Sequence, residues 1–163
     1  MKKPSFFEDV AEQPETLIRV FKEYSNGELK DRLRLAADQI RNRPVTIVSG
    51  MGSSCYAAEL FTLRLNSHGM LAFAMDASEL LHYRKPLLSN YLTLIGISQS
   101  GESIETCLVA ENRYENVPMI GITNKEDSRL AETSNILLPL LAGEEAETSS
   151  KTYIATLAVL NLL

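Results

Sequence analysis

The sequence predicts a three-layer, doubly wound α/β domain with a five-stranded parallel sheet, preceded by a helical arm. From residue 45 onward, five short apolar runs alternate with amphipathic segments. Strands joined by helical crossovers run parallel, because those connections are right-handed. A chain of 163 residues can bury one core without a disulfide or a structural metal.

Residues 1–43 are expected to form the helical arm. Pro14 suits the start of a helix, and Ser25-Asn26-Gly27 suits its end. A second helix follows, with one apolar stripe at helical spacing formed by Leu29, Leu33, Ala36 and Ile40. Arg43-Pro44 ends this helix. The stripe predicts that the arm packs on the main domain or on another subunit.

Residues 44–163 are expected to form the main domain. Short, continuous apolar runs predict buried strands at 45–49, 71–75, 91–97, 118–123 and 136–140. The intervening patterns predict helices at about 53–68, 77–83, 103–114, 128–133 and from 148 onward. A flavodoxin-like order would place the first and third strands side by side, and ligands bind beyond the carboxyl ends of such strands.

The charge distribution disfavours nucleic acid as a partner. The net charge is −5, and the lysines form no basic cluster. A small anionic ligand is still compatible with this charge, because backbone N–H groups and hydroxyls can hold it locally.

The start of the chain predicts neither a signal peptide nor a membrane span, so we expect a cytoplasmic protein. Cys55 and Cys107 are widely spaced in apolar surroundings, which indicates buried thiols in a reducing compartment. His68 and His82 have no metal-ligating partner at a suitable spacing, so no metal site is predicted.

Hydroxyl-rich turns follow the first, third and fifth predicted strands, at Gly50–Ser54, Ser98–Ser103 and Glu147–Lys151. Each turn precedes a helix, so each is expected to offer unpaired N–H groups and a positive dipole end. Serine is also a common N-cap without any ligand. Capping alone does not explain four Ser or Gln residues among the six after the third strand. Together the turns predict an oxyanion site.

The glycine-rich turn does not match a nucleotide-binding motif. Gly50-Met51-Gly52 lacks the third glycine of a dinucleotide fingerprint, and Cys55 stands in its place. No lysine follows a glycine as it does in a phosphate-binding loop of the Walker type. No cofactor is therefore expected.

At these residues the sequence closely resembles the sugar isomerase (SIS) domain family, and within it the first SIS half of the isomerase region of glucosamine-6-phosphate synthase and its isomerase and deglycase relatives. The resemblance covers about residues 45–163. It is carried by Gly52-Ser53-Ser54, Ala77-Ser78-Glu79-Leu80, Tyr83-Arg84-Lys85, Ile97–Ser103 and Ser149–Tyr153.

The resemblance implies a substrate site with two parts. The phosphate would be bound by Ser98, Gln99, Ser100 and Ser103. Ser54 and Ser149 would contact sugar hydroxyls. Gly52 and Ser53 belong to the substrate site as part of the same turn as Ser54. Glu147 stands where the synthase has a small apolar residue whose backbone touches the sugar.

The resemblance places the catalytic residues outside this chain. In the family's enzymes, a second SIS half supplies the acid/base glutamate, a ring-opening histidine and a lysine. We therefore expect this chain to be half of a longer protein and assign it no catalytic residue. Glu102 is interpreted as a cap or a bond to a neighbouring turn rather than a base. Lys151 is interpreted as an ion-pair residue, with an imine-forming role as the alternative.

Three functions are compatible with these observations. The first is the sugar-phosphate half of an aldose–ketose isomerase, aminotransferase or deglycase of amino-sugar metabolism, acting on fructose 6-phosphate or a fructosamine 6-phosphate. The second is a phosphosugar-sensing regulatory module without catalysis. The third is a structural domain whose turns merely cap helices. Self-association as a homodimer is expected under both functional hypotheses, because the resemblance implies sites completed by a second SIS unit.

Overall fold

The computed structural model describes residues 5–88, 91–146 and 148–163. Its centre is a five-stranded sheet in the order β2-β1-β3-β4-β5, and all neighbouring strands pair in parallel. The strands are β1 (Val45–Gly50), β2 (Ala72–Asp76), β3 (Leu92–Ile97), β4 (Met119–Thr123) and β5 (Ile136–Pro139). The predicted fold class and flavodoxin-like strand order are thus confirmed.

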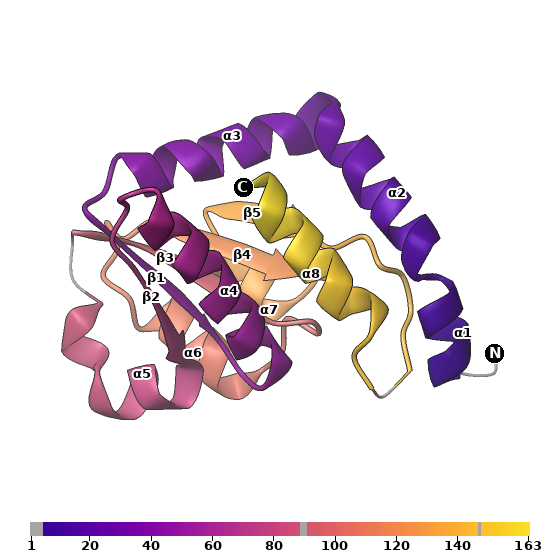
Figure 1. Cartoon of the computed structure of the whole chain (residues 1–163). Coiled ribbons are helices and arrows are strands. Elements are labelled where there is room, and N and C mark those ends of the chain that lie inside the picture. The colour runs from indigo at the N-terminus through magenta and orange to yellow at the C-terminus, as the bar shows by residue number, and fades with distance from the viewer. Residues whose placement is uncertain (1–4, 89–90, 147) are drawn as a thin grey trace.

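Helices cover both faces of this sheet, which gives the three layers seen in Figure 1. One face packs against α4 (Ser53–Ser67) and α8 (Lys151–Leu162). The other packs against α5 (Ala77–Tyr83), α6 (Ile104–Glu111) and α7 (Arg129–Thr133). Adjacent strand residues therefore enter opposite cores, as Ile95 and Leu94 do. A short 3-10 helix, η1 (Lys85–Leu87), follows α5.

Helices α6 and α8 are shorter than predicted. Helix α6 ends at Glu111, and the side-chain amide of the next residue, Asn112, donates to the carbonyl of Leu108. Helix α8 begins at Lys151 rather than near 148. Its N-cap residue Ser150 is non-helical, with a φ of −138°.

The N-terminal arm packs against the α4–α8 face of the sheet. It consists of α1 (Phe6–Ala11), α2 (Gln13–Ser25) and α3 (Gly27–Arg41), and Figure 1 shows it extending past α8. Its buried Val20 and Ile40 belong to the same apolar cluster as the sheet and α8. The Tyr24 hydroxyl donates to the carbonyl of Pro139 at 2.8 Å, which joins α2 to the end of β5. Burial raises the pKa of this tyrosine. The division of the chain at residue 43 stays a prediction.

Across the described ranges, no helix has the length and apolar character that a membrane span requires.

The buried hydrogen bond of Tyr24 should contribute measurably to stability. We expect Tyr24→Phe to lower the free energy of unfolding by about 1 to 2 kcal/mol, because it leaves the Pro139 carbonyl without its buried donor. Urea denaturation measures this change. Tyr83→Phe, at a side chain that is 81% exposed, is the control and should leave the midpoint unchanged. Equal midpoints for the two variants would contradict the assigned role of Tyr24.

Candidate functional site

The turns after β1 and β3 meet at the carboxyl edge of the sheet. Gly50 is paired with Ile97, so the two strands end side by side. A Cβ atom at Gly50 would lie 2.8 Å from the Ile97 carbonyl oxygen and 2.8 Å from Ser54 Cβ. Only glycine therefore allows the first turn of α4 to lie this close to the end of β3.

The β3–α6 turn, residues 98–103, is stabilised by its own serines. The Gly101 N–H donates to both the carbonyl and the hydroxyl oxygen of Ser98, each at 3.1 Å. The Glu102 N–H donates to Ser100 Oγ at 3.2 Å, and the Thr106 hydroxyl donates to Ser103 Oγ at 3.2 Å. Ser98 is buried, whereas Ser100 and Ser103 are half-buried.

These hydrogen bonds use the oxygen atoms of the three serines as acceptors. A serine hydroxyl also carries one proton that it can donate. Within the described ranges, Ser98, Ser100 and Ser103 have no acceptor for that proton. The turn thus presents three neutral donors, which suit an oxyanion.

Two of the helices that begin at this edge have their first turns capped by the chain's own side chains. In α5, Asp76 accepts a hydrogen bond from Ser78 N at 2.9 Å. In α7, the N-cap Ser128 caps the first turn, and Glu102 Oε1 accepts from Arg129 N at 3.0 Å. A carboxylate or hydroxyl in this place removes the unpaired donors that would otherwise attract an external anion.

Helix α8 is capped from the preceding loop. Glu145 Oε1 accepts hydrogen bonds from Ser150 N at 2.8 Å and from Thr152 N at 3.0 Å. The other carboxylate oxygen of Glu145 accepts a hydrogen bond from the Thr152 hydroxyl. An internal carboxylate therefore pairs the Ser150 N–H of the third turn, so this helix start offers an anion fewer donors than expected.

Helices α4 and α6 begin differently. Their N-cap residues are Gly52 and Ser103, and neither makes a side-chain capping hydrogen bond. The two helix starts lie on either side of the paired ends of β1 and β3. The positive ends of α4 and α6 are therefore the ones at this edge that no side chain caps within the described chain.

Residues 26–163 match the sequence profile of the SIS domain. The chain belongs to the SIS domain family. A glutamine–fructose-6-phosphate aminotransferase (isomerizing) from Thermotoga maritima is 28% identical over 165 residues, which cover 99% of this chain and 27% of the relative. The chain thus spans about a quarter of the length of this curated relative.

Two solved structures share the SIS fold of this chain. The C-terminal domain of glucosamine-fructose-6-phosphate aminotransferase from Francisella tularensis has a TM-score of 0.80 at 20% identity, with 96% of this chain and 45% of that chain covered. The sugar isomerase domain of an RpiR transcription factor from Sphaerobacter thermophilus has a TM-score of 0.73 at 20% identity, with coverages of 93% and 85%.

The structure brings the predicted site residues of the turns after β1 and β3 to one edge of the sheet. Gly52 and Ser53 are exposed, and Ser54 is half-buried. Ser149 is exposed at the start of α8, with its Oγ 2.9 Å from Thr152 Oγ1. Glu147 lies outside the described residues.

The structure confirms the interpretations of Glu102 and Lys151. The Glu102 carboxylate is bonded to the turn before α7, as described above. The Lys151 side chain is 3% exposed, and its Nζ lies 3.1 Å from Asp9 Oδ1 and 2.6 Å from Glu12 Oε2. Burial by itself lowers the pKa of Lys151, but hydrogen bonds to Glu12 and Asp9 outweigh it and raise the pKa overall. Imine formation needs a neutral amine, so this protonated lysine is unsuited to it.

The thiols only partly match their prediction. Cys107 is buried and donates to the carbonyl of Gly101 at 3.2 Å, whereas Cys55 is half-buried. Burial raises the pKa of both thiols, which disfavours the reactive thiolate. The described residues contain no group of three or more His, Cys, Asp or Glu side chains that could hold a metal ion.

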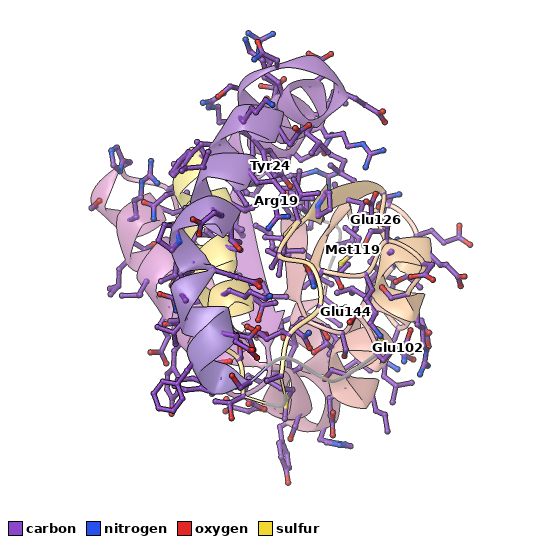
Figure 2. The ribbon with its side chains drawn as sticks, turned by 90° about the vertical axis from the view of Figure 1, so that its right-hand side faces the viewer. Arg19, Tyr24, Glu102, Met119, Glu126 and Glu144 are labelled. Carbon is purple, nitrogen blue, oxygen red and sulfur yellow. The ribbon has the colours of Figure 1, made fainter. Side chains whose placement is uncertain are left out.

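Sequence reasoning missed Asn124, which connects the β3–α6 turn with the loop after β5. Its backbone N–H donates to Gln99 O at 3.1 Å. Its side chain donates to Gly143 O at 2.7 Å and accepts from Ala142 N at 2.8 Å. In Figure 2, the labelled Glu102 and Glu144 mark these two loops. An asparagine directly after a buried strand at the same sheet edge was the available signal.

Gly101 should be essential for the shape of the β3–α6 turn. Its φ is +68°, and an added Cβ would collide with the Ser128 side chain. We expect Gly101→Ala to destabilise the domain by at least about 2 kcal/mol, because steric conflict adds to the cost of left-handed backbone. Gly69→Ala is a matched control: its φ is +78°, but nothing lies within 4 Å of the added atom. Denaturation midpoints that fall equally in both variants would show that contact with Ser128 is unimportant.

Proposed function

We propose that this SIS domain binds a hexose 6-phosphate, with the phosphate on the β3–α6 turn. The observation that carries this proposal is the pattern of helix capping. The chain caps α5, α7 and α8 with its own side chains, whereas no side chain caps α4 or α6 in the described ranges, and both begin beside a turn with three free hydroxyl protons. Such an arrangement attracts an anion without a cationic side chain.

In the proposed complex, the phosphate is held by Ser98, Gln99, Ser100 and Ser103. Gly52, Ser53, Ser54 and Ser149 contact the sugar. Hydrogen bonds to a charged group contribute about 1.5 to 3 kcal/mol each. Three or four such bonds support micromolar to millimolar affinity after the cost of association.

We further propose that the complete protein acts on fructose 6-phosphate or a fructosamine 6-phosphate, by isomerisation, amination or deglycation. Support comes from the similarity to the glutamine–fructose-6-phosphate aminotransferase (isomerizing) of Thermotoga maritima. Proton transfer between C1 and C2 needs an acid/base group. Glu102 is committed to α7 and Lys151 to an ion pair, so we assign that group to a second SIS unit. The exposure of Gly52, Ser53 and Ser149 leaves room for such a unit to close the site.

A phosphosugar-sensing module is the second candidate. It is supported by the structural likeness to the sugar isomerase domain of a transcription factor. Such a module would use the same uncapped helix starts to bind its ligand but would need no acid/base residue. The two candidates differ in turnover: a sensor leaves fructose 6-phosphate unchanged even after assembly with its partner unit.

Loss of two donors in the β3–α6 turn should weaken ligand binding. We expect fructose 6-phosphate, glucosamine 6-phosphate and inorganic phosphate to stabilise the chain in thermal-shift measurements, and Ser98→Ala/Ser100→Ala to bind each at least tenfold more weakly in calorimetry. Each lost charge-assisted hydrogen bond removes part of the phosphate affinity. Ser67→Ala, at an exposed serine near the far end of α4, is the control and should bind like the wild type.

Two outcomes would count against the proposed site. The first is the absence of any thermal or calorimetric response of the wild type to these three ligands. The second is binding by the double variant with wild-type affinity, which would move the ligand away from the β3–α6 turn.

A further inference from the structure

One buried ion pair connects α1 to the first residue of α8, directly after the loop that carries Ser149. Lys151 and Asp9 have side chains that are 3% and 0% exposed, and they lie 3.1 Å apart. The other salt bridges recorded among the described residues, apart from the second bond of Lys151 to Glu12, join side chains that are at least 31% exposed. Ion pairs at the surface contribute little, whereas the loss of one partner from a buried pair is strongly destabilising.

Asp9 also holds the other end of the same loop. Its Oδ2 atom accepts a hydrogen bond from Ala146 N at 2.8 Å. A single carboxylate on α1 therefore contacts the loop at Ala146 and the start of α8 at Lys151, on both sides of Ser149 in sequence. Figure 1 shows α1 beside the loop that leads into α8.

Helix α1 depends on this contact for its position. It is a helix of six residues, closed by a capping box between Ser5 and Glu8. Helices this short are marginal in isolation, so tertiary contacts must hold them in place. The bonds from Asp9 and Glu12 to Lys151 supply such contacts.

We propose that Asp9 and Lys151 are positioning residues for the sugar-contacting loop, with α1 acting as a strap that fixes the place of Ser149. The consequence for ligand binding rests on the proposed function, but the effect of the strap on the loop does not. The β3–α6 turn has hydrogen bonds of its own. The strap therefore governs the affinity for a hexose phosphate and leaves the affinity for inorganic phosphate unchanged.

The test uses Asp9→Asn in the full chain. The substitution keeps an oxygen that can accept from Ala146 N but removes the charge that pairs with Lys151. We expect fructose 6-phosphate to bind about tenfold more weakly in calorimetry, while the affinity for inorganic phosphate stays within twofold of wild type. Glu28→Gln is the control, because it removes a 77% exposed arm carboxylate that pairs with Arg32. It should change neither affinity.

Hydrogen exchange provides a readout that needs no ligand. In Asp9→Asn we expect the amides of residues 148–152 to exchange at least tenfold faster, while those of β3 keep their wild-type rates. A wild type that binds no sugar phosphate would refute the proposed function. The exchange rates alone would then test whether α1 holds the loop in place.

Two results for Asp9→Asn would overturn the proposed role of α1. One is wild-type exchange in residues 148–152, and the other is an equal loss of affinity for phosphate and for the hexose phosphate. If Asp9→Asn does not fold, Glu12→Gln replaces it in both measurements, because the Glu12 side chain is 55% exposed and its loss is tolerated more easily. For Glu12→Gln we expect the same pattern at about threefold. A Glu12→Gln protein with wild-type exchange and affinities would also reject the strap.

Discussion

The parallel pairing of β1 with β3 is the constraint on which the candidate site depends. Their register places Gly50 beside Ile97, so both strands end at the same point of the sheet edge. Helix α4 then packs on one face and α6 on the other, as their membership of two separate apolar clusters shows. Because the helices lie on opposite faces, their N-termini remain on either side of the paired strand ends. The positive field there comes from backbone geometry, which reconciles the proposed anion site with a net charge of −5.

Acidic side chains then restrict where an anion can bind. Asp76 and Glu145 occupy the starts of α5 and α8, and Glu102 bonds the start of α7. The orientation of Glu102 matters most, because it belongs to the β3–α6 turn itself. Its bond to the Arg129 backbone commits the carboxylate to a neighbouring helix start, and a carboxylate left free in this turn would repel a phosphate.

The fold and the positions of the turns after β1 and β3 could be predicted from the sequence, because both follow from local patterns. Buried apolar runs of strand length and amphipathic segments between them specify a parallel sheet, and the residue after each strand then lies at the carboxyl edge. The capping role of Glu145 could not be predicted, since an acidic loop before a helix is also typical of a solvated surface. Asp9 was equally hidden. Its sequence neighbours give no sign that it is buried against Lys151, which lies more than a hundred residues away.

The two halves of the candidate site are stabilised in different ways, and this difference bears on specificity. The serine hydroxyls of the β3–α6 turn accept hydrogen bonds from groups no more than three residues away. The backbone of the turn also bonds β4 and the start of α7, so the proposed phosphate-binding part is held by the sheet and its nearest helices and not by the arm. The loop before α8 depends on distant residues, namely Asp9 from the arm and Asn124 from the end of β4. A turn held by the sheet keeps its shape when the arm changes, whereas a loop bonded to the arm responds to such a change. In the complex that we propose, recognition of the phosphate would therefore stay constant while the arm adjusts the contact with the rest of the sugar.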